Sequence, residues 1–376
     1  MIYQLCNRCV MDSTDPLITF DRSGYCSYCS QFFETKVQRW HRGEHGLAKL
    51  RQLIDSLKRH GRHREFDAVL GLSGGIDSSY LALRSKDWGL RLLVVHVDGG
   101  WNSETAVSNI EKLVDYCGYE LFTYVVDWSE MKDLQLAYLK SGVTNQDVPQ
   151  DHAYFAALYG LAVQNRVPTI LSGGNLATEG IAPDWMFDPL DVTNLEAIHR
   201  QYGSRKLERF PRVSFWQRYV WYPMARGLRV LRPLNYLDYN KQVALADLKA
   251  TVGWMDYGRK HGESRFTKFY QNYYLPNRGY DKRRPHISSL VVSGQLTRSA
   301  ALTALEDPLY LPEELRTEME YVSRKLGVSE SELRHLVSLP PRDHRDFPNQ
   351  ETYAKRLRQV QAWSKKVLRR QLSPYS

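Results

Sequence analysis

Short apolar runs alternate with amphipathic stretches through the central half of the chain, from Phe66 onward. The apolar runs are predicted strands: Ala68–Leu72, Leu92–Val97, Leu121–Val126 and Thr169–Leu171. The stretches between them have helical spacing: Ser78–Ser85, Ser103–Cys117, Ser129–Leu139 and Asp151–Gln164. This alternation predicts an α/β fold, a doubly wound parallel sheet with helices on both faces. Ligands of such sheets bind where the strands end, so functional residues are expected directly after each strand.

The flanking segments have other patterns. Gly46–His60 predicts an amphipathic helix, and residues 183–232 are aromatic and irregular, which indicates a lid or a partly helical insertion that ends in a late strand near Arg229. The C-terminal third predicts helices over Ser264–Tyr274, His286–Val292, Thr297–Leu305, Pro312–Leu326, Ser329–Val337 and Gln350–Gln371. We therefore expect an N-terminal module with a bracing helix (1–62), a sheet domain (63–255) and a helical, basic C-terminal region (256–376).

Composition and charge indicate which kinds of binding partner the protein can have. Of the 376 residues, 43% are hydrophobic and 25% are charged, which is typical of a soluble globular protein. Neither a membrane-length apolar run nor a signal-peptide pattern is visible, so we expect a cytoplasmic protein without a membrane partner. Residues 251–376 hold 22 basic and 14 acidic residues, most of the net charge of +9. This favours an anionic partner, with solvated helix faces as the alternative.

Four of the five cysteines form two Cys-x-x-Cys pairs near the N-terminus: Cys6, Cys9, Cys26 and Cys29. In a chain without an export signal, a disulfide framework is not expected. Two such pairs place four thiolates around one tetrahedral Zn²⁺, and a site with four protein ligands is structural. An iron–sulfur cluster uses the same ligand type and is the alternative. Cys117 is more typical of a small buried residue than of a nucleophile.

A glycine-rich segment follows the first predicted strand: Ser73-Gly74-Gly75-Ile76-Asp77-Ser78. It is not a Walker A loop, because the lysine is missing, and it is not a GxGxxG fingerprint. It resembles the pyrophosphate-binding loop of the N-type ATP pyrophosphatases, the PP-loop enzymes. Glycines let backbone N–H groups face phosphate oxygens, and the dipole of the next helix favours an anion. Asp77 is expected to hold Mg²⁺, and a plain Gly-Gly turn is the alternative.

Two further strand ends fit a nucleotide site. His96 and Asp98 close the second strand, where PP-loop enzymes border the adenosine, and a second glycine-rich turn at 172–175 closes the fourth strand. The expected ATP-binding residues are Leu72, Ser73, Gly74, Gly75, Asp77, Ser78, Ser79, His96, Asp98, Gly173 and Asn175. The resemblance implies that a substrate oxygen attacks the α-phosphorus of ATP while the loop holds the departing pyrophosphate.

The basic C-terminal third contains a second distinctive segment, residues 258–298. Glu263 lies just before a predicted helix start, and Arg265 and Lys268 share a helix face because they are three residues apart. The two cations could bind a nucleotide-sugar diphosphate while the carboxylate transfers protons. Asp77, Glu263, Arg265 and Lys268 are therefore the candidate catalytic residues. The alternative is a solvated helix that packs through its aromatic residues.

No glutaminase is recognisable in the chain. Cys117 lacks the first glycine of a nucleophile elbow, and the residue after the initiator is Ile2 rather than a cysteine. If ammonia is the nucleophile, a partner must deliver it.

Together, the cysteine pairs, the loop at Ser73 and the segment from Gly258 resemble the N-acetyl sugar amidotransferases of surface-polysaccharide and nonulosonate biosynthesis, the WbpG/PseA type. The resemblance runs from Cys6 to about Leu305. It implies conversion of an acetamido group of a nucleotide-linked or related sugar, in pathways such as lipopolysaccharide O-antigen synthesis, to an acetamidino group through an adenylated imidate. It also implies ammonia supply by separate glutaminase and cyclase-like subunits, with ATP, Mg²⁺ and Zn²⁺ as cofactors.

Two other functions remain open. A PP-loop tRNA thiolase would suit the cysteine pairs and the basic C-terminus. Such reactions generally need a reactive cysteine or a cluster in the sheet domain, and only Cys117 is available there. A non-catalytic RNA-binding or scaffold protein is disfavoured by the intact glycine-rich loop, so a nucleic-acid partner is not expected.

Overall fold

A computed structural model describes residues 3–257, 262–357 and 359. Five parallel strands form one sheet in the order β3-β2-β1-β4-β5. Their bounds are β1 Ala68–Gly71, β2 Leu92–Asp98, β3 Glu120–Val125, β4 Thr169–Leu171 and β5 Arg229–Leu231. Chain order reverses between β1 and β4, and a crevice at the carboxyl ends of these two strands is where doubly wound sheets bind ligands.

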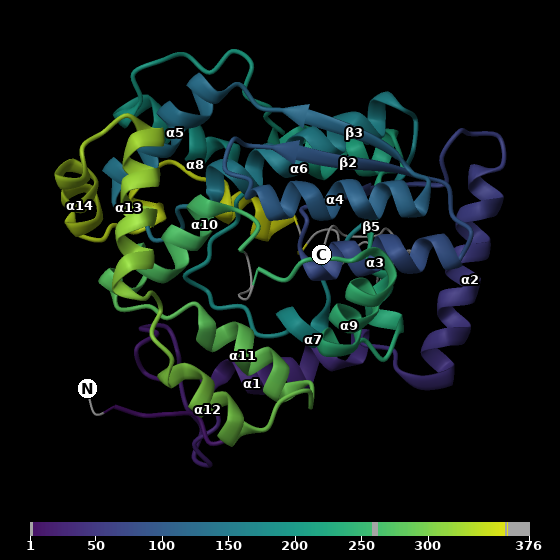
Figure 1. Cartoon of the computed structure of the whole chain (residues 1–376), viewed down its shortest axis with the longest axis horizontal. Coiled ribbons are helices and arrows are strands. Elements are labelled where there is room, and N and C mark those ends of the chain that lie inside the picture. Colours follow the sequence, from purple (N-terminus) through teal and green to yellow (C-terminus); the bar gives the residue numbers. More distant parts are fainter. Residues whose placement is uncertain (1–2, 258–261, 358, 360–376) are drawn as a thin grey trace.

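Helices surround this sheet (Figure 1). Those of the first half are α1 Ser27–Gln31, α2 Gly43–Gly61, α3 Ile76–Asp87, α4 Glu104–Cys117, α5 Trp128–Ser141, α6 Val148–Gln164, α7 Leu176–Glu179 and α8 Val192–Tyr202. The later ones are α9 Lys241–Val252, α10 Arg265–Phe269, α11 Arg283–Val292, α12 Arg298–Glu306, α13 Pro312–Leu326 and α14 Glu330–Ser338. None of the helices in the described part of the chain is long and apolar enough to span a bilayer.

Both faces of the central strands are buried, as the near-continuous apolar runs predicted. In β1, Ala68 and Leu70 belong to one core with residues of α2, α3, α4 and α9, whereas Val69 belongs to a second core with residues of α6. Successive side chains of a strand point to opposite faces, so a run that is apolar at every position fits a sheet covered on both sides. The predicted doubly wound parallel sheet is therefore confirmed.

The predicted elements exist with shifted ends. The first helix of the sheet domain begins at Ile76 and not at Ser78, and the helix predicted over Ser264–Tyr274 consists of α10 followed by a π-helical turn, Tyr270–Tyr274. Thr297 and Ser329 are N-caps, as expected from their hydroxyls. Residues 258–261, and most of the predicted helix over 350–371, lie outside the described residues.

The irregular segment 183–232 is largely structured. It contains α8, the π-helix Gln217–Ala225 and β5, which pairs with β4 at the sheet edge. The three-region division at residues 62 and 255 stays a proposal. One apolar core already includes Cys6, Leu70 and Trp254, from both sides of the first proposed boundary.

Candidate functional site

The glycine-rich loop links β1 to α3 in the conformation that an anion site needs. Gly74 has φ +84°, a left-handed conformation that side chains disfavour, and Gly75 is the N-cap residue of the twelve-residue helix α3. The N–H of Gly75 donates to Ser73 Oγ at 3.2 Å, and Ser78 Oγ lies 3.2 Å from both Ser73 Oγ and the Gly75 carbonyl oxygen. The serine hydroxyls thus hold the curl of the loop next to a helix N-terminus.

A cavity of about 1300 Å³ opens at the carboxyl ends of the strands. Its lining includes eight of the residues predicted from the sequence: Ser73, Gly75, Asp77, Ser78, His96, Gly173, Asn175 and Glu263. Residues from segments up to 190 positions apart therefore meet at one site. This position agrees with the expectation that ligands of the sheet bind where its strands end.

The Asp77 carboxylate is held by two side chains that the sequence did not indicate. Tyr239 donates its phenolic hydrogen to Oδ1, and Thr178 Oγ1 donates to Oδ2 at 3.0 Å. Burial, followed by the charge of Asp77, raises the pKa of Tyr239, so the phenol stays a neutral donor. Asp77 is thus oriented at the cavity wall, with oxygen ligands of the type that Mg²⁺ prefers.

Most of the hydrogen bonds of His96 and Asp98 stabilise the turn that follows β2. His96 Nδ1 lies 3.0 Å from the Leu72 carbonyl oxygen and Nε2 lies 2.9 Å from Asn102 Nδ2, which also donates to Asp98 Oδ1 at 3.0 Å. Because a carbonyl only accepts, Nδ1 carries the proton and Nε2 accepts from the amide. His96 lines the cavity, whereas Asp98 supports it from behind by bonding the Gly100 N–H at 2.7 Å.

The second glycine-rich turn packs directly on the first. A Cβ on Gly173 would lie 2.6 Å from the backbone nitrogen of Ser78, so only glycine lets β4 approach α3 this closely. Asn175 caps α7 by accepting from Thr178 N at 3.0 Å. This cap also places Thr178 beside Asp77.

Residues from the start of the C-terminal region contact the glycine-rich loop. The backbone of Glu263 accepts from Ser103 N at 2.8 Å, which docks this segment on the turn after β2. The Glu263 carboxylate reaches to 3.3 Å from the position of a Cβ on Gly75. Tyr257 donates to the Gly74 carbonyl oxygen at 3.2 Å, and burial, then Glu263, raise its pKa. Glu263 is thus placed at the loop, as a residue with a role in proton transfer would have to be.

The predicted catalytic role of Arg265 and Lys268 does not fit their positions in the structure. They share a helix face, as predicted, but that face contacts α13 and neither residue lines the cavity. Arg265 Nε lies 3.1 Å from Glu318 Oε1, and Lys268 Nζ lies 2.6 Å from Glu314 Oε1. Their charges are compensated by carboxylates of α13, which sequence spacing could not indicate. We therefore assign them to packing.

Four predicted ATP-binding residues lie behind the cavity wall. Leu72, Gly74, Ser79 and Asp98 are absent from its described lining. Ser79 is fully buried, and no hydrogen-bond partner is described for its hydroxyl. That this hydroxyl contacts phosphate stays a prediction, and its burial away from the cavity lining does not favour it.

Sequence reasoning also missed polar residues on the opposite wall. Asp147 lines the cavity and accepts from Thr267 Oγ1 at 3.0 Å and from Gln150 Nε2 at 3.2 Å. Burial, and then the nearby charge of Asp151, raise its pKa well above the usual range. Lys282 faces the same space and partly offsets this shift. Asp147 lies in no motif, and Lys282 lies inside the distinctive segment 258–298 but was not among the residues predicted there.

The four N-terminal cysteines lie together and are fully buried. All four sulfurs lie within 4.8 Å of one another, with Cys6 and Cys29 at 3.9 Å and Cys9 and Cys26 at 3.7 Å. Four thiolates about 2.3 Å from one ion are about 3.8 Å apart, so the donors fit a single tetrahedral metal. A four-iron cluster binds each thiolate through its own iron and needs a wider spacing. A cysteine metal site is thus supported, and Zn²⁺ is the ion that we propose.

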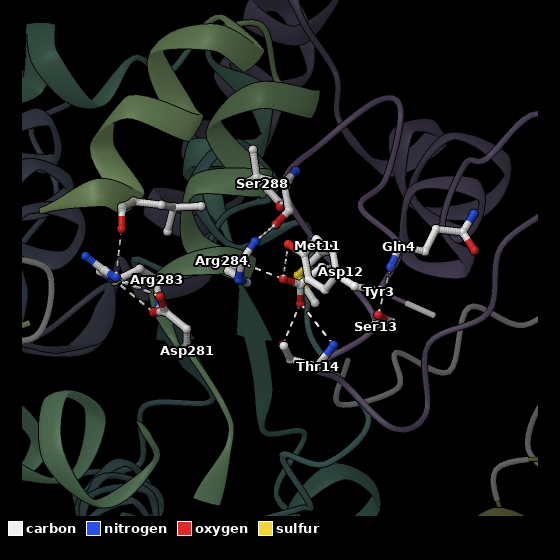
Figure 2. A network of polar contacts seen from close by, with 12 residues as sticks. Tyr3, Gln4, Met11, Asp12, Ser13, Thr14, Asp281, Arg283, Arg284 and Ser288 are labelled. Atoms are coloured by element: carbon white, nitrogen blue, oxygen red, sulfur yellow. Dashed lines mark hydrogen bonds and ion pairs between the residues drawn. The ribbon is translucent and has the colours of Figure 1, made fainter. Parts of the chain in front are cut away.

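The cysteine loop is tied to α11 and α12. Arg298 Nε donates to the carbonyl oxygens of Cys6 and Cys9, both at 3.1 Å. Figure 2 shows the adjoining ion pair between Arg284 and the buried Asp12, at 3.0 Å. Arg284 also donates to the Val10 carbonyl oxygen at 2.8 Å. In Figure 1 the purple N-terminal segment accordingly lies beside the green helices α11 and α12. The cysteine site thus anchors helices that line the cavity.

Comparisons with known proteins give one family and several distant structures. Residues 263–361 match the family described as LPS biosynthesis protein WbpG-like, C-terminal domain. No curated protein matches the sequence. NMN synthetase from Francisella tularensis is 14% identical with a TM-score of 0.36, covering 79% of this chain and 98% of that chain.

Two further structures are similarly distant. The tRNA thiolase NcsA from Methanococcus maripaludis, solved with its iron–sulfur cluster, is 14% identical with a TM-score of 0.35, covering 81% of this chain and 89% of that chain. The NH₃-dependent NAD synthetase from Campylobacter jejuni is 16% identical with a TM-score of 0.28, covering 41% of this chain and 72% of that chain. The family match agrees with the predicted resemblance over residues 263–361: this part of the chain is similar to a WbpG-like C-terminal domain, and it follows the segment that forms the doubly wound sheet.

Proposed function

We propose that the protein is an ATP-dependent amidotransferase that converts the acetamido group of a nucleotide-linked N-acetyl sugar to an acetamidino group, in surface-polysaccharide synthesis. The observation that carries the proposal is the meeting of Glu263, from the WbpG-like domain, with the glycine-rich loop at Gly75. Two segments that resemble the same enzyme family thus form one wall of one cavity.

The loop suits the departing pyrophosphate. Ser73 and Ser78 present hydroxyls at the cavity, and the N-terminus of α3 favours an anion. Asp77, fixed by Tyr239 and Thr178, would hold Mg²⁺, which neutralises phosphate charge when bound. In the first step the amide oxygen attacks the α-phosphorus of ATP, pyrophosphate leaves, and an imidate-AMP forms.

Ammonia then attacks the imidate carbon, and the C–O bond to AMP breaks. The attacking nitrogen must lose a proton, and Glu263 and Asp147 are carboxylates on the cavity wall that could accept it. Burial, and then the charge of Asp151, raise the pKa of Asp147, and a higher pKa makes its carboxylate a stronger proton acceptor. Ammonia supply by separate glutaminase and cyclase-like subunits remains part of the proposal.

A thiolase is less well supported by the geometry. Cys117 does not line the cavity, its thiol lies 4.0 Å from the Ala82 carbonyl oxygen, and burial raises its pKa to about 11. A thiol of this kind is a poor nucleophile because little thiolate forms.

The test is incubation of the protein with ATP, Mg²⁺, ammonium and UDP- or CMP-linked N-acetyl sugars. We expect AMP and pyrophosphate by anion-exchange chromatography and a product in which NH replaces O by mass spectrometry. Asp77→Asn should abolish turnover and keep the metal content. Release of ADP and phosphate, or turnover independent of the sugar, would contradict the proposal.

A further inference from the structure

The strand β3 forms one edge of the sheet (Figure 1). It has six residues, Glu-Leu-Phe-Thr-Tyr-Val, and its register with β2 is continuous from Glu120 to Val125. Natural proteins usually protect a sheet edge by a short strand, a bulge, a lysine or a proline, because its open backbone groups can pair with another chain. The opposite edge, β5, fits this rule with three residues that begin at Arg229. The edge at β3 does not.

Hydrophobic side chains of β3 are exposed on the surface of the single chain. Phe122 is 43% exposed and Val125 is 70% exposed. Leu121 and Tyr124 are half-buried and pack against different cores of the protein. Aromatic and β-branched residues favour strand pairing, and a short apolar strand with little charge is prone to it. The edge therefore offers apolar side chains as well as backbone groups to a further strand.

The backbone of β3 directs its polar groups to two sides. The N–H of Val126 donates to the Asp98 carbonyl oxygen at 2.9 Å, so Val126 faces β2. Successive residues of a strand direct their N–H and C=O groups to alternate sides, so Leu121, Thr123 and Val125 direct theirs away from β2. Within residues 3–257, 262–357 and 359, no hydrogen bond to these outward groups is found. Three donors and three acceptors thus lie in a row along the edge.

This row is complementary to itself. If a twofold axis passes beside Thr123, two copies of β3 lie antiparallel, with Thr123 opposite its own counterpart and Leu121 opposite Val125 of the second copy. Residues that face each other in this way exchange both of their backbone hydrogen bonds. The three pairs, with two bonds each, use every outward N–H and C=O group of both strands.

The side chains match in the same register. Phe122 would lie opposite Tyr124 of the second copy on one face of the joined sheet, and the two copies of Thr123 would meet on the other face. Aromatic pairs and threonine pairs both stabilise antiparallel strands. The charged residue of the strand, Glu120, would lie at its end, opposite the apolar Val126. No like charges therefore lie directly opposite each other.

We propose that two copies of this chain pair through β3, antiparallel about Thr123, and join their sheets into one sheet of ten strands. A second copy is the partner that the edge fits, because its backbone groups and its side chains are complementary to themselves in one register. Closed twofold dimers are also the commonest homo-oligomers. No residue of β3 lines the cavity, so this inference is independent of the proposed function.

The test measures the mass of the full chain in solution by sedimentation velocity, at concentrations between about 1 and 100 μM. We expect wild type to form a dimer in this range. Thr123→Lys places two ammonium groups beside the twofold axis, and Thr123→Glu places two carboxylates there. Each variant alone should raise the dissociation constant of the dimer by at least about tenfold. An equimolar mixture of the two should form dimers again, because opposite charges meet only if position 123 faces itself.

Thr317→Lys, at an exposed threonine of α13, is the matched control and should dimerise like wild type. Val125→Lys places a charge opposite the apolar Leu121 and is a second test of the same edge, should the variants at Thr123 fail to fold by circular dichroism. A wild-type chain that stays monomeric up to about 100 μM would overturn the proposal. Dimers that persist in folded Thr123→Lys or Val125→Lys, or a mixture of the two Thr123 variants that stays monomeric, would also overturn it.

Discussion

Tyr239 donates its phenolic hydrogen to the carboxylate of Asp77, and removing this one bond tests whether Asp77 must be oriented for turnover. The variant is Tyr239→Phe, which keeps the buried ring and deletes the hydroxyl. After the change, only Thr178 still donates a hydrogen bond to Asp77 among the side-chain bonds described above. The carboxylate can then rotate away from the position in which it would hold Mg²⁺.

The expected size follows from the strength of such a bond. A hydrogen bond to a charged group contributes about 1.5–3 kcal/mol, which corresponds to a fall of about 10- to 150-fold in kcat/KM if the bond persists in the transition state. The assay is pyrophosphate release under saturating sugar nucleotide and ammonium, over a range of MgATP concentrations. Excess Mg²⁺ should restore part of the loss, which a purely structural defect would not allow.

Tyr80→Phe is the matched control. Tyr80 packs 5.6 Å from the Tyr239 ring and bonds Asp247 instead, at 3.5 Å, and it does not line the cavity. It should retain activity within about twofold. If Tyr239→Phe also stays within that range, or if Tyr80→Phe loses as much activity, the assigned role of the Tyr239–Asp77 bond is wrong.

Three further predictions concern the metal site and pH. Arg298→Met removes the bonds to the carbonyl oxygens of Cys6 and Cys9 and should lower the free energy of unfolding by about 2–3 kcal/mol, measured by urea denaturation. The wild-type protein should contain one zinc per chain by elemental analysis, and Cys26→Ser should lower this metal content. Burial lowers the pKa of His152 to about 4, so the folded state resists protonation of this ring. Stability is therefore full above the unfolded pKa of about 6.5 and falls by up to about 3 kcal/mol as the pH drops to 4, a loss that His152→Gln should reduce.

The outcomes that would contradict these predictions are distinct. Arg298→Met with wild-type stability would show that the cysteine loop holds itself in place. If the protein contains several irons per chain in place of one zinc, the conclusion that the four sulfurs bind a single metal ion is wrong. An identical pH dependence of stability in wild type and His152→Gln would mean that other groups cause the acid loss.

The sequence predicted the features that are local in the chain. The strand–glycine–helix order around Ser73 and the paired cysteines each lie within a short segment, so their spacing alone indicated an anion loop and a metal site. The contact between Tyr239 and Asp77 joins residues 162 positions apart. Such a contact depends on how α9 packs beside α3, and a local sequence pattern does not predict this packing.

The error at Arg265 has a similar cause. Spacing shows that Arg265 and Lys268 share a helix face, but it does not show what that face meets. The facing helix, α13, supplies Glu314 and Glu318 from about 50 residues further along. The sequence did not single out Lys282 within its basic segment, because burial, and not sequence, distinguishes it from its neighbours.

The central claim is that the amide oxygen of the sugar attacks the α-phosphorus of ATP. The most direct measurement places isotopically heavy oxygen in the acetamido carbonyl of the sugar nucleotide and follows it by mass spectrometry after turnover with ammonium. The label should appear in AMP, because the amide oxygen leaves the sugar with the adenylate. Label that stays on the sugar, or that appears in pyrophosphate, would contradict the claim.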